Sequence, residues 1–226
     1  MNSLELMQQF RQDIDDVADP KLWSDGEVAY YANDAQRMFC RLTNGISDSS
    51  SLVCELDVVV GQVEFDLHPS IMRIRRASRG SDGRPLQIMN IDDVDKMGHR
   101  MNKRSGPVHG MIIGMDELTG RWDAVPSVKD TVTLTVFRLP LNTIKPFDPT
   151  IPVADQKKVQ LEIPEQHHWH LLMWMKHLAY GRQDSDTYDA RKADINERAF
   201  RAYCLQAKIE QDNTRRVARS IAYGGL

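Results

Sequence analysis

The sequence IPEQHHWHLLMWMKHLAYG, residues 163–181, contains the most apolar run of the chain. Pro164 stands where the first residue of a helix would be, and Gly181 stands where a helix would stop. Between them, apolar side chains occupy nearly every face of the predicted helix: Trp169, Leu172, Met173, Trp174, Met175 and Leu178. A helix that is apolar nearly all round is normally buried. This segment is therefore predicted to be the most buried helix of the fold.

A long helix is predicted to follow, beginning near Ser185. Its apolar stripe is predicted to comprise Ala193, Ile195, Ala199, Phe200, Tyr203, Cys204 and Ala207. The last residues, NTRRVARSIAYGGL, are basic and lose the stripe, which is typical of a segment that becomes ordered on a partner.

Two helices are predicted before the middle of the chain. Leu6, Phe10, Ile14 and Val17 recur at helical spacing, and Pro20 ends that segment. Ser24 and Glu27 have the spacing of a capping box, which predicts the start of a second helix. Its apolar face is predicted to run from Val28 to Leu42, with Gly45 as the stop.

The middle of the chain changes to a period of two. Leu52, Cys54, Leu56, Val58 and Val60 are predicted to share one face of a strand. Further strands are predicted at 61–69, 72–76 and 86–91, with SRGSDGRP as a turn, and a helical turn at 92–97. MIIGMDELTGRWDAV is typical of a hairpin, and Val132, Leu134 and Val136 alternate with threonines in the clearest strand.

The order of these elements predicts an α+β fold. We expect a four-helix bundle with a β-rich domain inserted between helices two and three, followed by a C-terminal extension. The corresponding ranges are 1–46 for the first helix pair, 47–150 for the β-rich insertion, 151–212 for the second pair and 213–226 for a docking tail.

Composition argues against several classes of protein. The 226 residues carry a net charge of −3, so the chain as a whole is not a basic nucleic-acid binder. Cys40, Cys54 and Cys204 are far apart and lack zinc spacing, which predicts buried thiols in a reducing cytoplasm. The amino terminus lacks the pattern of a signal peptide, and no run is long enough to span a bilayer, so we expect no membrane partner.

Few residues suggest chemistry. Glu165, His167, His168, His170 and His177 are clustered, but their spacing differs from the HExxH zinc motif, so they are predicted to edge a buried helix. Asp92, Asp93 and Asp95 lack the other residues of a calcium loop and are predicted to lie at a helix start. There is no GxSxG, P-loop or GxGxxG motif. We therefore predict no catalytic residue, no metal and no cofactor.

Short motifs in a fixed order resemble the podovirus head-to-tail adaptor (connector or neck) family of tailed bacteriophages. These are LWSDGEVAYYANDAQRMFCR at 22–41, FDLHP at 65–69, VTLTVFRLPL at 132–141 and IPEQHHWHLLMWMKHLAY at 163–180. The resemblance spans about residues 23–203. It implies a non-enzymatic virion protein that forms a ring, usually of twelve copies, beneath the portal protein. Such a ring carries the tail tube or nozzle, and double-stranded DNA passes through its lumen without sequence-specific binding.

The same resemblance implies that the C-terminal segment reaches into the portal, which makes Arg215, Arg216, Arg219 and Tyr223 candidate portal contacts. Charge segregation suggests the subunit interface, because a closed ring joins two different faces of the subunit. The acidic candidates are Asp15, Asp16 and Asp19, and the basic candidates are Arg198 and Arg201. Acidic and small polar side chains are expected to line the DNA channel.

Two alternatives remain open. One is a lytic hydrolase of the phage particle that uses Asp92, Asp93 and Glu117 as its carboxylates. The other is a DNA-binding accessory protein that acts through two arginine patches, one in the tail and one formed by Arg73, Arg75, Arg76, Arg79 and Arg84.

Overall fold

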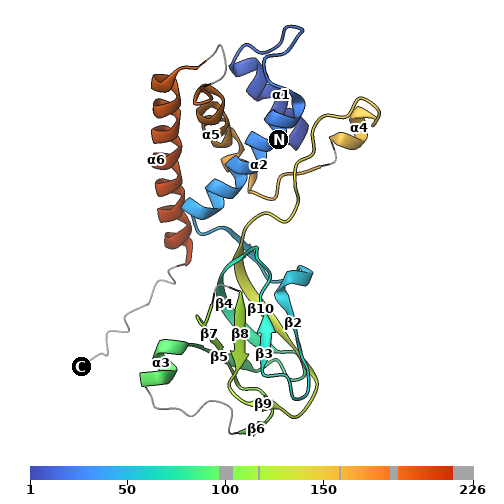
Figure 1. Ribbon diagram of the computed structural model, residues 1–226, viewed down its shortest axis with the longest axis vertical. Coiled ribbons are helices and arrows are strands. Elements are labelled where there is room, and N and C mark those ends of the chain that lie inside the picture. Colours follow the sequence, from blue (N-terminus) through green and yellow to red (C-terminus); the bar gives the residue numbers. More distant parts are fainter. Residues whose placement is uncertain (97–103, 117, 158, 184–187, 216–226) are drawn as a thin grey trace, which may run out of the picture. The chain divides into compact units, whose positions relative to one another are not determined.

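The computed structural model describes residues 1–96, 104–116, 118–157, 159–183 and 188–215 (Figure 1). The chain forms two compact units. The helical unit consists of Met1–Asn44 and Pro140–Leu226, and the β unit consists of Gly45–Leu139. Because the helical unit draws on both ends of the sequence, helices that are far apart along the chain pack together within it.

Helix α1 spans Ser3–Asp13 and begins with a capping box between Asn2 and Glu5. It ends earlier than expected, because the apolar spacing continues to Val17 and Pro20 was predicted to end the segment. Asp15 adopts a left-handed conformation (φ 60°), and the Asp16 amide donates to the Arg11 carbonyl at 2.9 Å. This is the geometry of a Schellman stop, in which glycine usually occupies the left-handed position.

Helix α2 spans Asp25–Leu42 and begins at the predicted capping box of Ser24 and Glu27. The Glu27 amide donates to Ser24 Oγ at 3.2 Å, and the Ser24 amide donates to the Glu27 carboxylate at 2.8 Å. Thr43 closes the helix, since both its amide and its hydroxyl donate to the Phe39 carbonyl.

Helix α5, His168–Tyr180, follows a 3-10 turn at Glu165–His167 and packs against α1, α2 and α6. Its buried side chains are His168, Leu171, Leu172, Trp174, Met175 and Ala179. Trp169 is 59% exposed, so one face of the helix that was predicted to be the most buried has no neighbour among the described residues. An apolar composition identified the helix but did not show which of its faces lacks a neighbour.

Helix α6 spans Ala190–Arg215. Asp189 caps its start, since the Asp189 carboxylate accepts from the Lys192 amide at 2.9 Å. The face toward the core carries Ala193, Phe200, Cys204 and Ala207. Ile195 and Ala199 were predicted on that stripe, but both are exposed.

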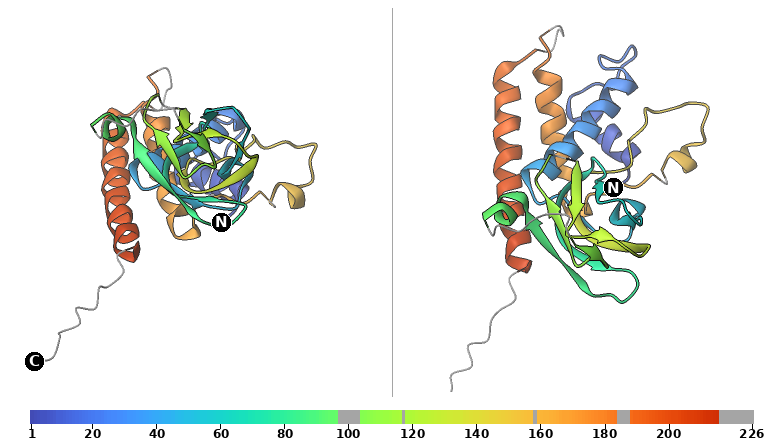
Figure 2. Two further views of the ribbon diagram at one scale, coloured as in Figure 1. Left: turned by 90° about the horizontal axis from the view of Figure 1, so that it is seen from below. Right: turned by 60° about the horizontal axis from the view of Figure 1, so that its bottom comes forward.

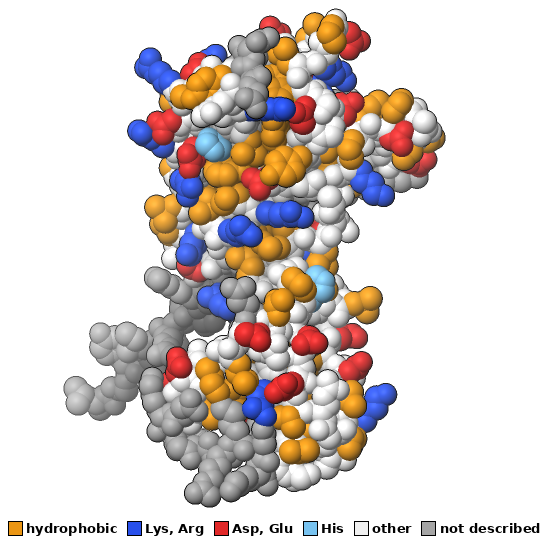
Figure 3. All heavy atoms as spheres, in the orientation of Figure 1, with side chains coloured by type: hydrophobic (Ala, Val, Ile, Leu, Met, Phe, Trp, Pro, Cys, Tyr) orange, Lys and Arg blue, Asp and Glu red, His pale blue; other side chains and the backbone are white. Residues whose placement is uncertain are grey.

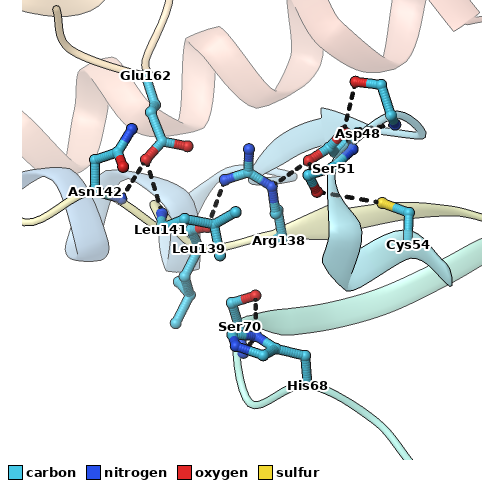
Figure 4. A network of polar contacts seen from close by, with 11 residues as sticks. Asp48, Ser51, Cys54, His68, Ser70, Arg138, Leu139, Leu141, Asn142 and Glu162 are labelled. Atoms are coloured by element: carbon cyan, nitrogen blue, oxygen red, sulfur yellow. Dashed lines mark hydrogen bonds and ion pairs between the residues drawn. The ribbon is translucent and has the colours of Figure 1, made fainter. Parts of the chain in front are cut away.

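Residues 140–157 and 159–162 form an arm that leaves the body of the helical unit and returns (Figure 1). It carries α4, Val153–Gln156, which has no buried residue. Asn33 fixes the start of the arm by exchanging two 2.8 Å hydrogen bonds with the backbone of Ile144. Glu162 closes it by accepting from the amides of Leu141 and Asn142 (Figure 4).

The β unit is built on an eight-stranded mixed sheet in the order β1-β10-β4-β5-β7-β8-β3, with β2 also paired to β10. β5 and β7 are parallel, and their crossover includes α3. A separate pair consists of β6 and β9. The elements are β1 Ile46–Asp48, the 3-10 turn Leu52–Cys54, β2 Glu55–Val58, β3 Glu64–Asp66, β4 Ile71–Arg79, β5 Pro85–Asn90, α3 Ile91–Lys96, β6 Ser105–Gly106, β7 Gly110–Ile113, β8 Thr119–Trp122, β9 Val125–Pro126 and β10 Asp130–Arg138.

Strand β10 supplies the centre of the β core. Val132, Leu134 and Val136 are fully buried, as the alternation predicted, and the threonines between them are half-buried. The predicted hairpins also form, since β4 pairs with β5 and β7 pairs with β8, both antiparallel. The predicted strand from Leu52 to Val60 is shorter, because Leu52 and Val60 lie outside β2 and are exposed.

A buried ion pair joins β1 to β10 within the β unit (Figure 4). Arg138 Nε donates to Asp48 Oδ2 at 2.5 Å. Burial alone would raise the pKa of Asp48, but hydrogen bonds from Ser50, Ser51 and Arg138 outweigh it and hold that pKa far below its usual range. Asp48 therefore stays ionised and fixes the edge strand to the central strand.

The predicted fold class was wrong. Instead of a four-helix bundle with an inserted β domain, the described residues form six α-helices and a large curled mixed sheet (Figure 2). Two of the helices, α3 and α4, are short and lie outside the group formed by α1, α2, α5 and α6. Helical periodicity reveals amphipathic segments, but it indicates neither their packing partners nor a parallel strand pair reached through a crossover.

Candidate assembly surfaces

The turn after α1 contains the three predicted acidic interface residues. Asp15 and Asp19 are exposed, whereas Asp16 is 2% exposed. The Asp16 carboxylate accepts from the Arg11 guanidinium and from the Leu22 amide, the latter at 2.7 Å. Asp16 is therefore satisfied within its own subunit, and Asp15 and Asp19 carry the charge that this turn presents to solvent. We call these two residues the acidic turn.

Arg11 links the end of α1 to the start of α2. Its guanidinium is bound to Asp16 and also to Asp25, the latter at 2.6 Å, while its side chain is only 9% exposed. Lys21 adds a longer contact to Asp25 at 3.6 Å. Buried charges are tolerated when they are paired in this way, so the network stabilises the geometry of the turn.

The predicted basic residues lie on the solvent side of α6. Arg198 pairs with Asp194 one turn earlier at 2.8 Å, and its side chain is 78% exposed. Arg201 pairs with Glu197 at 2.8 Å and lies 5.9 Å from the centre of the Trp174 ring. Exposed pairs within one helix contribute little stability, so these arginines can exchange their partners at low cost.

The same side of α6 also carries an apolar stripe. Ile195, Leu205 and Ile209 are 55%, 61% and 53% exposed, and Ala199 and Ala202 between them are exposed as well. At about 100° per residue, these five side chains project opposite to the core face of the helix. We call these five residues the outer face of α6. Ile195 and Ala199 were predicted to lie on the core stripe of this helix, and a second stripe was not predicted.

Figure 3 shows basic and acidic side chains gathered along the edge of the helical unit that α6 forms. Of the predicted portal contacts, Arg216, Arg219 and Tyr223 lie outside the described residues, and so does the side chain of Arg215. The contacts of these four residues with a portal stay a prediction.

The histidines of α5 and of the 3-10 turn before it serve as packing groups. His167 Nδ1 hydrogen bonds to the Tyr203 hydroxyl at 2.8 Å, and the ring of His170 stacks on Tyr203 with centroids 3.3 Å apart. His168 Nε2 donates to the Ile163 carbonyl at 2.7 Å, and His177 Nδ1 donates to that of Ala193 at 3.0 Å. Burial lowers the pKa of His167 and of His170, which keeps both rings neutral at pH 7.

No group of three or more metal-ligating side chains occurs among the residues that the structure describes. Asp92 and Asp93 lie in the first turn of α3, as predicted, while Glu117 and the side chain of Asp95 lie outside the described part of the chain. No helix within that part is both long and apolar enough to cross a bilayer.

The arginines of β4 and of the turn that follows it differ from one another. Arg79 forms two hydrogen bonds with Asp82, and Arg84 lies 3.4 Å from the same carboxylate. Arg73 lies over the ring of Phe137, 4.8 Å from its centre. Arg75 and Arg76 are exposed, so this strand presents positive charge to solvent.

Comparison with protein-family models gives a match to the family described as SU10 adaptor protein, over residues 1–222. Comparison with curated proteins gives no match. The family match confirms the resemblance to phage head-to-tail adaptors. A structural adaptor of this kind is a virion-associated, non-enzymatic protein that contacts other phage structural proteins. The chain therefore belongs to the SU10 adaptor protein family and has the role of a phage adaptor.

Proposed function

We propose that copies of this protein form a closed ring beneath the portal, connect it to the tail tube or nozzle, and continue the channel through which DNA passes. Twelve copies are the number that the family resemblance implies. Membership of the SU10 adaptor family carries this proposal. The ring itself requires two different surfaces on each subunit, since identical surfaces would close a dimer instead.

Two chemically different surfaces of the helical unit support that requirement. The acidic turn presents Asp15 and Asp19, and the solvent side of α6 presents Arg198 and Arg201. In the proposed ring, the acidic turn of one subunit faces α6 of the next. Asp16 contributes indirectly, because its bond to Arg11 holds the turn in place.

Negative-stain microscopy of the purified protein, with and without portal, tests this function. We expect rings on the portal. A protein that neither binds the portal nor self-associates would refute the proposal. Replacing both residues of the acidic turn with lysine should weaken assembly at low salt, because like charges would then meet. A matched control is Asp66→Lys, an exposed acid of strand β3 in the other unit, which should leave ring formation unchanged.

The tail has a separate role in the proposal. We expect Arg215, Arg216, Arg219 and Tyr223 to contact the portal, so a chain that ends at Asn213 should bind portal more weakly while keeping its secondary structure. Circular dichroism and cosedimentation with portal measure the two properties. Unchanged cosedimentation would place the portal contact elsewhere on the molecule.

A second candidate function is DNA binding through β4. The exposed guanidinium groups of Arg73, Arg75 and Arg76 favour it, because phosphate contacts need accessible positive charge. A gel shift of duplex DNA that weakens steeply with salt would support this function, and replacing all three with glutamine should abolish the shift. Absence of any shift at low salt would exclude it.

A further inference from the structure

The helical unit has a groove between α1 and the arm, with a volume of about 770 Å³. Leu4 and Met7 of α1 form part of its lining together with Leu161, and all three are nearly buried. Ile151 and Val159 of the arm line it as well and are each 43% exposed. The groove is therefore a concave surface with apolar side chains on both sides.

Ile144 and Leu161, near the two ends of the arm, are buried, but apolar side chains around α4 are exposed. Helix α4 has no buried residue, and Val153 within it is 48% exposed. The backbone of the arm is nonetheless fixed near the groove, because the Ser3 amide donates to the Val159 carbonyl at 3.1 Å. Apolar side chains held at the surface on a fixed backbone are typical of a site that another protein covers.

The outer face of α6 is the convex counterpart of this groove. Figures 1 and 2 place α6 and the arm on opposite sides of the helical unit. Figure 3 shows hydrophobic side chains on the projecting arm. One concave and one convex apolar surface on opposite sides of a subunit are what a head-to-tail contact between identical copies needs.

Spacing along the two helices gives the orientation of such a contact. Leu4, at the groove, and Asp13, at the end of α1, are nine residues apart, which is about 14 Å at 1.5 Å per residue, and Asp15 follows two residues beyond that end. Arg198 and Ile209 are eleven residues apart within α6, which is about 16 Å. The two spans are therefore of similar length. An antiparallel α6 from a neighbour can therefore place Ile209 over the groove while Arg198 reaches Asp15.

We infer that the groove between α1 and the arm receives the outer face of α6 from a second copy of this chain, with the two helices antiparallel. This inference rests on the proposed ring and adds its apolar contact, its register and its direction. Charge complementarity selects the second copy as the occupant, because the acidic turn follows α1, which lines the groove, and Arg198 lies on the same side of α6 as its outer face. Leu205 and Ile209 enter the groove, and Arg198 exchanges Asp194 for the acidic turn of the neighbour.

Disulfide cross-linking tests the contact. A chain that carries both Val159→Cys and Ile209→Cys should give a ladder of covalent oligomers on mild oxidation. Each copy then has one added thiol at the contact with each of its two neighbours. Either variant alone should remain monomeric on a non-reducing gel. A chain with Tyr30→Cys and Ile209→Cys is the matched control, because Tyr30 is 63% exposed on α2 and lies off the groove.

The outcomes separate this inference from the proposed function. Rings on the portal without a ladder would overturn the inference and leave the ring intact. A covalent dimer alone, or an equal ladder from the Tyr30 control, would also overturn the inference. Absence of both rings and cross-links would overturn both proposals. A ladder that ends at the copy number of the ring supports both.

A second measurement does not depend on added cysteines. Replacing Leu205 and Ile209 together with glutamate should weaken self-association at least tenfold, because two carboxylates would enter an apolar groove. Both positions are exposed in the isolated subunit, so the helical content should not change. Lys208→Glu is the matched control on the same helix, since Lys208 does not belong to the outer face. Equal association of all three proteins would refute the contact.

Discussion

Replacing Asp16 with asparagine tests whether the acidic segment after α1 stabilises the fold as well as the assembly. The variant keeps the volume of the side chain and removes its charge. In the structure, the Asp16 carboxylate accepts from the Arg11 guanidinium and from the Leu22 amide. Asparagine can accept one of these bonds, but its amide group then faces the other donor.

The expected loss is about 3 kcal/mol of unfolding free energy. A hydrogen bond to a charged group contributes about 1.5–3 kcal/mol, and a buried donor without an acceptor costs about 1–3 kcal/mol. The total stays below the sum of these terms, because Arg11 retains its 2.6 Å contact with Asp25. For a protein of this size, each kcal/mol lowers the melting temperature by about 2–4 °C. We therefore expect a decrease of about 6–12 °C.

Urea unfolding followed by circular dichroism at 222 nm measures the loss. The matched control is Asp15→Gly, which removes the neighbouring carboxylate. Asp15 has a φ of 60°, where glycine is unstrained, so this variant should be as stable as the parent or more stable by up to about 1 kcal/mol. It should nevertheless assemble less well on the portal. A variant at Asp16 within about 0.5 kcal/mol of the parent would refute the stabilising role.

Three further predictions concern other parts of the chain. Gly120→Ala should destabilise the β unit by about 1–3 kcal/mol in chemical denaturation, because an added methyl group would collide with the ring of Phe65. Burial lowers the pKa values of His167 and His170 below 6.5, so between pH 7 and pH 5 the unfolded chain binds more protons than the folded chain. The melting temperature should therefore fall as the pH is lowered from 7 to 5, and His170→Gln should reduce that fall. Burial also raises the pKa of Cys204 to about 12, so its thiol should resist alkylation at pH 8 until the protein unfolds, as mass spectrometry would show.

Local features of the sequence predicted local structure well. The capping box of Ser24 and Glu27 starts α2 as expected, because both of its partners lie within one helical turn. The alternation from Val132 to Val136 identifies the central strand, because a buried face repeats every second residue. The family resemblance was also confirmed, since its motifs encode such local elements in a fixed order.

The errors arose where the outcome depended on distant partners. The left-handed conformation of Asp15 ends α1 before Val17, although the apolar spacing continues through that residue. Helix α6 carries two apolar stripes on opposite faces, and spacing alone did not separate the core stripe from the exposed one. Neither feature follows from apolar spacing alone. Each is decided by which surfaces the rest of the chain covers.

Counting acidic residues in the sequence overestimates the negative charge that a neighbouring subunit can reach. This affects how the proposed ring is held together. Asp13 pairs with Lys176 at 2.6 Å, and Asp16 pairs with Arg11, so only part of the acidic segment is available to a neighbour. Exposed ion pairs contribute little affinity and are screened by salt, whereas buried apolar area is not. In the proposed contact, the outer face of α6 therefore supplies most of the affinity, and the acidic turn sets the register. Rings should accordingly persist at about 1 M salt, where the Debye length is near 3 Å, and form more slowly there than at low salt. Dissociation of the rings at that salt concentration would show that charge, and not the apolar groove, holds the subunits together.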